Sequence, residues 1–220
     1  MSSKVNWRNF FSNLYQSYKP DYVRSGYGSE FALFLRKLVI KRAKEKFYKN
    51  GIVLDIGCGI GNFSQYFPKE KYVGIDIVKK AIQEAKEKYA LNLLLSDAQK
   101  LPFKKDSFSF VIAVEVLQYI ENKDLFFEEV LRVMKSDGNC VLITQNPDSI
   151  IWKLRMKKRG RSPLLFASIE EIERILGKDK IMILGGIYTP FDFLLLLSLP
   201  NFPKEFIKQF AKSFYVVFRK

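Results

Sequence analysis

Short apolar segments alternate with helical segments through the middle of this 220-residue chain, and this pattern limits the fold more than any other feature. Strands are predicted at residues 52–56, 72–76, 91–95, 108–114 and 140–144, and helices at 62–67, 79–89 and 123–134. The strands are apolar along most of their length, which is typical of strands that are covered on both faces. The pattern therefore predicts an α/β fold with a mostly parallel sheet between two helical layers.

Further helices and strands are expected on both sides of this region. Aromatic residues at helical spacing predict an amphipathic helix from Trp7 to Tyr18, and a polar loop separates it from a second helix over 30–48. After the alternating region, a capping box starts a helix over 168–176. Strands are predicted at 181–188 and 213–219, so that the sheet ends in the last residues of the chain.

The residue types that are missing exclude several kinds of chemistry. The chain has no histidine and only two cysteines, Cys58 and Cys140. Without histidine there is no Ser–His or Cys–His nucleophile and no histidine base. No metal site is expected, and cysteines without CxxC spacing are interpreted as free thiols of an intracellular protein. No signal peptide is expected, and the most apolar run, at 191–200, has about half the length of a membrane-spanning helix. We therefore expect a cytoplasmic protein.

The formal net charge of +14 is unevenly distributed along the chain. Residues 51–147 carry 12 basic and 13 acidic side chains, so the basic excess lies in the two flanks. Such an excess suggests anionic partners, for example nucleic acid, phosphorylated metabolites or anionic lipid. A lysine-rich surface that only keeps the protein in solution is an equally good interpretation.

A glycine-rich turn follows the first strand of the alternating region, in the sequence VLDIGCGIGNF at 53–63. Glycines allow positive φ and a close approach of a ligand to the backbone, and a following helix offers free N–H groups. A dinucleotide fingerprint has the spacing G-x-G-x-x-G, whereas Gly57, Gly59 and Gly61 run G-x-G-x-G. Asp55 at the mouth of the turn would repel a phosphate and attract a cationic cofactor. S-adenosylmethionine fits this requirement, because it carries a sulfonium and an amino group and no phosphate.

With these residues the chain resembles the class I S-adenosylmethionine-dependent methyltransferases, in particular the small methyltransferases related to those of quinone biosynthesis. Four segments match in order, VLDIGCGIGNF (53–63), YVGIDIVKKAI (72–82), LSDAQKLPFKKDSFSFVIAVEVLQYI (95–120) and LRVMKSDGNCVLIT (131–144). The resemblance implies a Rossmann-like sheet of seven strands, mostly parallel, with helices on both faces and an antiparallel last strand. It also implies S-adenosyl-L-methionine as methyl donor and S-adenosyl-L-homocysteine as product.

The resemblance assigns cofactor roles to residues at the carboxyl ends of the strands, where open α/β sheets bind ligands. Asp76 is placed like the family's acidic residue that accepts hydrogen bonds from both ribose hydroxyls, and Ile77 would pack on the adenine. Asp97, which could instead only cap a helix, would lie with Ala98 at the adenine edge. The residues expected to bind the cofactor are Asp55, Gly57, Cys58, Gly59, Gly61, Asp76, Ile77, Asp97, Ala98, Ala113 and Val114.

No catalytic residue is singled out by the sequence. The family often has a pair of histidines after the fourth strand, where this chain has Gln118 and Tyr119. A base is needed only if the acceptor must lose a proton, because the cofactor already activates the methyl group. The weak candidates for such a base are Glu115, Tyr119, Tyr15 and Tyr18, and the tyrosines could equally be core residues.

The acceptor is expected to be a small apolar or lipid-like molecule. This expectation rests on the basic run at 152–161 and the apolar segment at 189–210, which could form a lid beside an anionic head group or membrane surface. The apolar run could also pack on the sheet or form a homodimer interface. The alternatives are an RNA methyltransferase, a nicotinamide-dependent oxidoreductase, which the glycine spacing disfavours, and a non-catalytic methyltransferase-like subunit.

We expect a single domain over residues 1–220. Its parts would be an N-terminal helical cap at 1–50, a cofactor-binding core at 51–147, and substrate-side insertions with a closing hairpin at 148–220.

Overall fold

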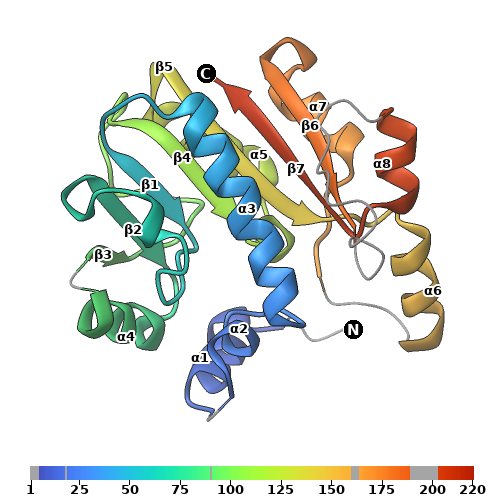
Figure 1. The fold of residues 1–220 in the computed structure, drawn as a ribbon, viewed down its shortest axis with the longest axis horizontal. Helices are drawn as coiled ribbons and strands as arrows, with labels where there is room; N and C mark the ends of the chain where they lie inside the picture. The colour runs from blue at the N-terminus through green and yellow to red at the C-terminus, as the bar shows by residue number, and fades with distance from the viewer. Residues whose placement is uncertain (1–4, 18, 90, 160–163, 189–202) are drawn as a thin grey trace.

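A computed structural model of the chain describes residues 5–17, 19–89, 91–159, 164–188 and 203–220, with the backbone alone at 151, 155–156 and 158–159. Within these ranges seven strands form one sheet in the order β3-β2-β1-β4-β5-β7-β6 (Figure 1). The strands are β1 (Val53–Ile56), β2 (Tyr72–Asp76), β3 (Asn92–Leu95), β4 (Phe108–Val114), β5 (Met134–Gln145), β6 (Ile181–Ile187) and β7 (Ser213–Arg219).

The sheet is parallel except for its last strand along the chain. β3, β2, β1, β4 and β5 pair in parallel, and β7 lies antiparallel between β5 and β6. This confirms the predicted seven-stranded, mostly parallel sheet with an antiparallel last strand. The two final strands do not form a tight hairpin, because α8 (Lys204–Phe210) lies between them in the chain.

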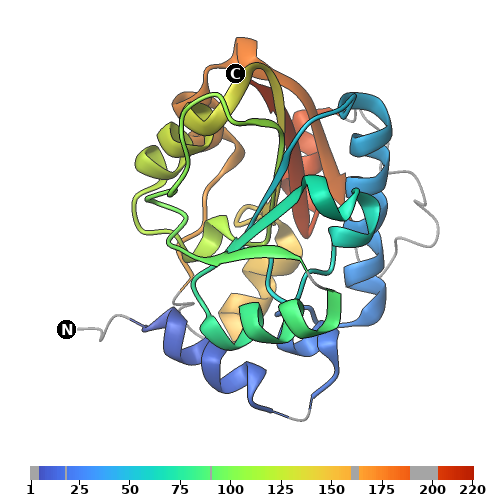
Figure 2. The same cartoon turned by 90° about the vertical axis from the view of Figure 1, so that its left-hand side faces the viewer.

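Helices cover both faces of the sheet, as Figure 2 shows with α3 on one side and α5 on the other. On one face lie α3 (Glu30–Phe47), which packs against β4 and β5, and α4 (Lys79–Tyr89), which packs against β2 and β3. On the other face lie α5 (Lys123–Val133), α7 (Ile169–Leu176) and α8. The central strands are therefore buried on both sides, which explains why their sequences are apolar throughout.

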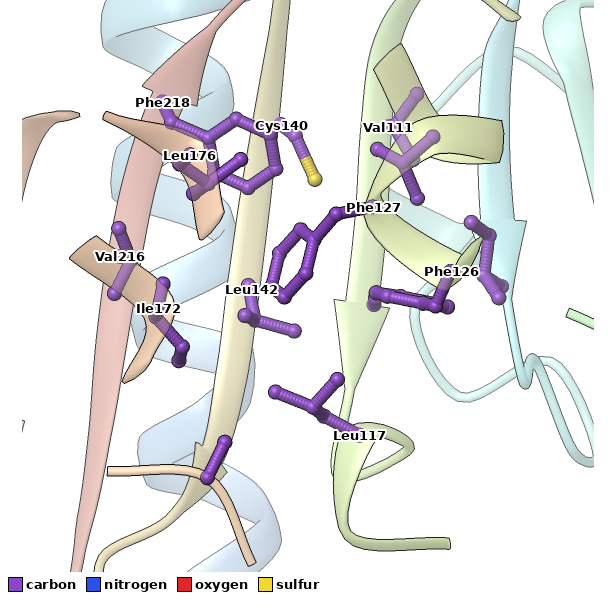
Figure 3. Packing of buried hydrophobic residues seen from close by; sticks show 14 of the residues in the cluster. Val111, Leu117, Phe126, Phe127, Cys140, Leu142, Ile172, Leu176, Val216 and Phe218 are labelled. Carbon is purple, nitrogen blue, oxygen red and sulfur yellow. The ribbon is translucent and has the colours of Figure 1, made fainter. Parts of the chain in front are cut away.

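The core on the α5 side is built around two adjacent phenylalanines of that helix, Phe126 and Phe127, which are almost completely buried. Figure 3 shows Phe127 pointing toward β5 beside Cys140 and Leu142. The rings of Phe127 and Phe218, which comes from β7, lie edge to face with their centroids 6.0 Å apart. Helix α5 and strand β7 therefore contribute to the same apolar cluster on this face of the sheet.

The N-terminal segment lies at the end of the sheet where the parallel strands finish (Figures 1 and 2). It contains α1 (Trp7–Tyr15), which was predicted, and α2 (Asp21–Arg24), which falls in a segment predicted as a loop. The short α2 forms because Arg24 is held by Glu84 of α4, with nitrogen–oxygen distances of 2.6 and 2.7 Å. No local periodicity in the sequence could indicate a helix that depends on this distant contact.

The helix predicted at 62–67 is wrong, because this segment forms only one 3₁₀ turn, η1 (Ser64–Tyr66). Gly61 has φ +79°, and Phe67 is extended before Pro68, which disfavours helical backbone in the residue that precedes it. Too few residues remain between them for an α-helix. The glycine turn is therefore not followed by the helix that was expected to offer free N–H groups.

The remaining elements are short or shifted relative to the predictions. β5 starts at Met134 and is therefore longer than the strand predicted at 140–144, and the basic run lies mainly on α6 (Ile150–Arg159). Short 3₁₀ turns are η2 (Lys69–Lys71), η3 (Leu117–Tyr119) and η4 (Lys178–Lys180). Of the apolar segment predicted as a lid at 189–210, residues 189–202 lie outside the described residues, and α8 occupies the last part. Among the residues that are described, no helix has the length and apolar character needed to cross a membrane.

Candidate active site

The glycine turn joins β1 to the edge of a cavity at the carboxyl ends of the strands. Gly57, Gly59 and Gly61 all have positive φ, of 70°, 53° and 79°. The turn is tied to β2 because the N–H groups of Gly57 and Cys58 both donate to the carbonyl of Ile75, at 2.8 and 2.9 Å. A Cβ on Gly57 would lie 2.1 Å from a methyl carbon of Val116. A residue with a side chain at this position would therefore be strained, and its side chain would fill the space between the glycine turn and Val116.

Asp76 ends β2 and faces the same cavity. Its Oδ2 accepts the N–H of Gly59 at 2.9 Å, and its Oδ1 accepts the N–H of Val78 at 2.9 Å. Burial raises the pKa of this carboxyl, while the backbone N–H donors act in the opposite direction. Because a carboxylate has about four acceptor sites, Asp76 can still accept a hydroxyl from a ligand.

The cavity brings together most of the residues that the sequence assigns to the cofactor. Asp97 and Ala98, which follow β3, lie in the same lining as the glycine turn and the end of β4. The carboxylate of Asp97 accepts the N–H of Gln99 at 2.8 Å and so also shapes its own turn. The predicted cofactor residues in the lining are Gly57, Cys58, Gly59, Asp76, Ile77, Asp97, Ala98 and Val114.

Three predicted cofactor residues are not part of this lining, namely Asp55, Gly61 and Ala113. Asp55 is 1% exposed, and its carboxylate accepts the hydroxyl hydrogen of the buried Tyr72. Burial raises the pKa of Asp55 to about 7; the Tyr72 hydrogen bond opposes this shift and the charge of Asp76 adds to it. The structure thus places Asp55 behind the glycine turn, and its contact with the amino group of a cofactor stays a prediction.

An aromatic wall faces the cavity from α1 and η3. The rings of Trp7 and Phe11 pack edge to face on Tyr119, with centroid distances of 4.9 and 5.1 Å. All three residues line the cavity, and Tyr27 and Phe63 line it as well. The sequence predicts the aromatic stripe of the N-terminal helix, but only Tyr15 and Tyr18 of this stripe were candidates for the site. The stripe indicated a buried face, and only the fold shows that it covers a cavity.

The tyrosines proposed as bases have different positions in the structure. Tyr15 is buried in the lining, and burial is the main cause that raises its pKa, with a further contribution from Asp76. Burial and the charge of Glu115 raise the pKa of Tyr119 to about 12. Both hydroxyls therefore keep their protons at neutral pH. Tyr18 lies outside the described residues.

Glu115, the fourth candidate, comes directly after β4 and lines the cavity. It forms a buried ion pair with Arg36 of α3, with a nitrogen–oxygen distance of 2.6 Å. Arg36 was not found in the sequence, because it is one of many basic residues on a helix and nothing local marks its distant partner.

The donor set around the cavity fits S-adenosylmethionine. A partly buried carboxylate has acceptor sites left for hydroxyl donors, the glycines of the turn leave room beside the cavity, and Ile77 adds an apolar side chain to the lining. The buried acidic side chains also suit a cofactor with a sulfonium charge.

Comparisons with known proteins agree with this geometry. Residues 54–142 match the family model described as a methyltransferase domain. The chain is 30% identical to a malonyl-[acyl-carrier protein] O-methyltransferase of Legionella pneumophila over 64% of this chain and 51% of that protein. It is 29% identical to the ubiquinone/menaquinone biosynthesis C-methyltransferase UbiE of Desulfotalea psychrophila over 51% of this chain and 48% of that protein. The chain thus spans about half the length of these curated relatives.

A solved structure shows the same fold. It is that of a SAM-dependent methyltransferase of Thermotoga maritima, described as a possible histamine N-methyltransferase. The TM-score is 0.64 over 84% of this chain and 89% of that protein, with 17% sequence identity. At this identity the likeness supports the Rossmann-like architecture and leaves the acceptor open.

Proposed function

The chain belongs to the S-adenosylmethionine-dependent methyltransferases, and on this premise we propose that it transfers the methyl group of S-adenosyl-L-methionine to a small apolar or lipid-like acceptor. The observation that carries the proposal is the cradle formed by the glycine turn and Asp76 at the mouth of a cavity with an aromatic wall. Residues 51–147 would hold the cofactor, and the segments 1–50 and 148–220 would contribute to the acceptor side.

The chain's own residues would bind and orient the two reactants. Asp76 would accept the ribose hydroxyls, the backbone of Gly57 and Val114 would flank the methionine end, and Asp97 and Ala98 would lie at the adenine edge. When bound, the cofactor supplies a methyl group on a sulfonium, which an aligned nucleophile displaces in line. Trp7, Phe11 and Tyr119 would align the acceptor and exclude water from the cavity.

The apolar character of the acceptor is supported by the aromatic wall and by the relatives. Among the relatives, UbiE is named for ubiquinone/menaquinone biosynthesis, and a further relative is a 2-methyl-6-phytyl-1,4-hydroquinone methyltransferase of Synechocystis. On α6, Leu154 is 60% exposed between the exposed Lys153 and Lys157. This surface suits a peripheral contact with an anionic membrane, which we include in the proposal.

Methyl transfer from labelled S-adenosylmethionine to a fractionated extract of the host cells tests the proposal. The label is expected in the lipid or small-molecule pool and should be lost in Asp76→Asn. Label only in RNA would instead support an RNA methyltransferase. Binding of S-adenosylhomocysteine without label in any pool would support a non-catalytic subunit.

A further inference from the structure

Glu115 has an unusual backbone at the floor of the cavity. It has φ +56°, a left-handed conformation that is uncommon for residues other than glycine, directly after the last residue of β4. Its side chain is 10% exposed and belongs to the cavity lining. Residues with a strained backbone are held in place by the surrounding structure, and they occur most often at binding and active sites.

Several donors fix the carboxylate of Glu115. Oε1 accepts from Nε and Nη2 of Arg36, at 3.0 and 2.6 Å, and from the hydroxyl of Ser213, at 3.2 Å. Oε2 accepts from Nε2 of Gln118 at 2.9 Å. The four residues come from α3, β7, η3 and the end of β4, so the carboxylate is held by parts of the chain far apart in sequence.

Arg36 is itself held in place by further contacts. Its guanidinium is buried, donates through Nη1 to the carbonyl of Ala32 at 2.9 Å, and lies 5.7 Å from the ring centroid of Tyr27. Gln118 is anchored as well, because its Oε1 accepts the hydroxyl of Thr144 at 3.1 Å. The arrangement compensates the charge of Glu115 and sets the direction of both of its oxygens.

The two oxygens differ in what they can still bind. Oε1 already has three donors, whereas Oε2 has the one donor from Gln118 and can accept another hydrogen bond. The described lining of the cavity, to which Glu115 belongs, also includes Trp7, Phe11 and Tyr119 and contains no lysine or arginine. In spite of the strongly basic composition of the chain, this lining offers an anion no cationic partner.

We propose that Oε2 of Glu115 accepts a hydrogen bond from the methyl acceptor and that Arg36 is the positioning residue that holds Glu115 for this contact. The reacting end of the acceptor is then a neutral or cationic group with an N–H or O–H donor on an apolar body, and it is not a phosphate or carboxylate. This inference rests on the proposed function and specifies the acceptor class of that site.

Binding of small probes to the protein saturated with S-adenosylhomocysteine tests the inference. Benzylamine, benzyl alcohol and benzoate share one ring and differ in charge and in their donors, and ligand-detected NMR titration measures their affinities. Benzylamine and benzyl alcohol are expected to bind at least about tenfold more tightly than benzoate, because hydrogen bonds to charged groups are strong. Glu115→Gln should remove most of this preference.

Two further variants separate positioning from simple stabilisation. Arg36→Met should abolish the preference for the donor probes, and Arg36→Lys should restore part of it, while both keep their affinity for S-adenosylhomocysteine. The matched control is Arg132→Met, which breaks the ion pair with Glu129 at a distance of 2.5 Å outside the described lining. The control is expected to leave the preference unchanged.

The outcomes distinguish this inference from the proposed function. Failure of the unsubstituted protein to bind S-adenosylhomocysteine would overturn the proposed function. With that binding intact, equal affinity for benzoate and benzylamine, no binding of either donor probe, or an unchanged preference in Glu115→Gln would overturn the acceptor class. Equal losses in Arg36→Met and Arg132→Met would overturn the positioning role of Arg36.

Discussion

At the scale of single residues, Asp55 and Asp76 show how position decides the role of one side-chain type. The two aspartates lie near the ends of neighbouring strands, β1 and β2. Asp76 accepts two backbone N–H groups and lines the cavity, whereas Asp55 is sealed behind the turn with Tyr72. We expect Asp76 to bind the ligand and Asp55 to influence stability with pH.

Substitution of Asp76 should weaken binding of S-adenosylhomocysteine. Asp76→Asn removes the charge and one acceptor oxygen, and loss of a hydrogen bond to a charged group costs about 1.5–3 kcal/mol. Calorimetric titration measures this loss, which corresponds to at least about tenfold in affinity. Asp137→Asn, the same change at an exposed position of β5, serves as control. Unchanged affinity in Asp76→Asn would contradict the ribose assignment.

Asp55 should make the protein more stable at moderately acidic pH. Its pKa is raised from 3.8 to about 7, so its stabilising contribution is complete below pH 3.8 and is lost as the pH rises through 7. Asp55→Asn is neutral throughout. The gain in unfolding free energy between pH 8 and pH 5 should therefore be smaller in the variant, by up to about 2.5 kcal/mol, since the pH falls about two units below the raised pKa.

Urea unfolding at the two pH values provides this measurement, again with Asp137→Asn as control. Equal gains in the wild-type protein and in Asp55→Asn would show that the Asp55 carboxyl does not titrate in this range.

At the scale of elements, helices and strands with strong local sequence patterns lie where they were predicted. Elements that depend on contacts with distant parts of the chain were not predicted correctly. The amphipathic patterns of α4 and α7 and the apolar runs of β2, β4 and β7 predict their positions closely. By contrast, α2 depends on a contact of Arg24 with α4, and the turn at 64–66 is limited by Gly61 and the extended residue before Pro68. Neither constraint can be recognised from the hydrophobic periodicity of a short stretch of sequence.

The N-cap of α7 should contribute measurably to stability. The Ser168 side chain accepts the N–H of Glu171 at 3.1 Å, and the helix buries Ile169, Ile172 and Leu176. Ser168→Ala should lower the unfolding free energy by about 1 kcal/mol because this N–H loses its partner. Ser168→Asn, which can cap the helix, should retain most of the stability in urea unfolding. A similar loss in both variants would contradict a capping role.

At the scale of the whole molecule, β7 joins the two halves of the sheet. It pairs with both β5 and β6, and its side chains enter the apolar clusters on both faces. Arg36 and Ser213 extend this connection to Glu115 on the floor of the cavity. The last strand of the chain therefore supports the candidate site as well as the core.

A cavity in this shared core should destabilise the fold strongly. Phe218 is fully buried and contacts Phe127, so Phe218→Ala should lower the unfolding free energy by about 3–5 kcal/mol. Phe210→Ala on α8, where the ring is 42% exposed, should cost much less. Thermal or urea unfolding measures both changes, and equal losses would contradict a core that runs from α5 to β7.

The sequence by itself determined the alternation of strands and helices, the glycine turn and the acidic residues at strand ends, because each has a signal within a few neighbouring positions. Only the tertiary structure decided that Asp55 lies behind the turn, that the aromatic stripe of α1 covers a cavity, and that Arg36 holds Glu115. These three features depend on contacts between residues far apart in the chain. The physical reason is that periodicity and spacing report which face of an element is buried, whereas the partner on that face is fixed only when the elements pack.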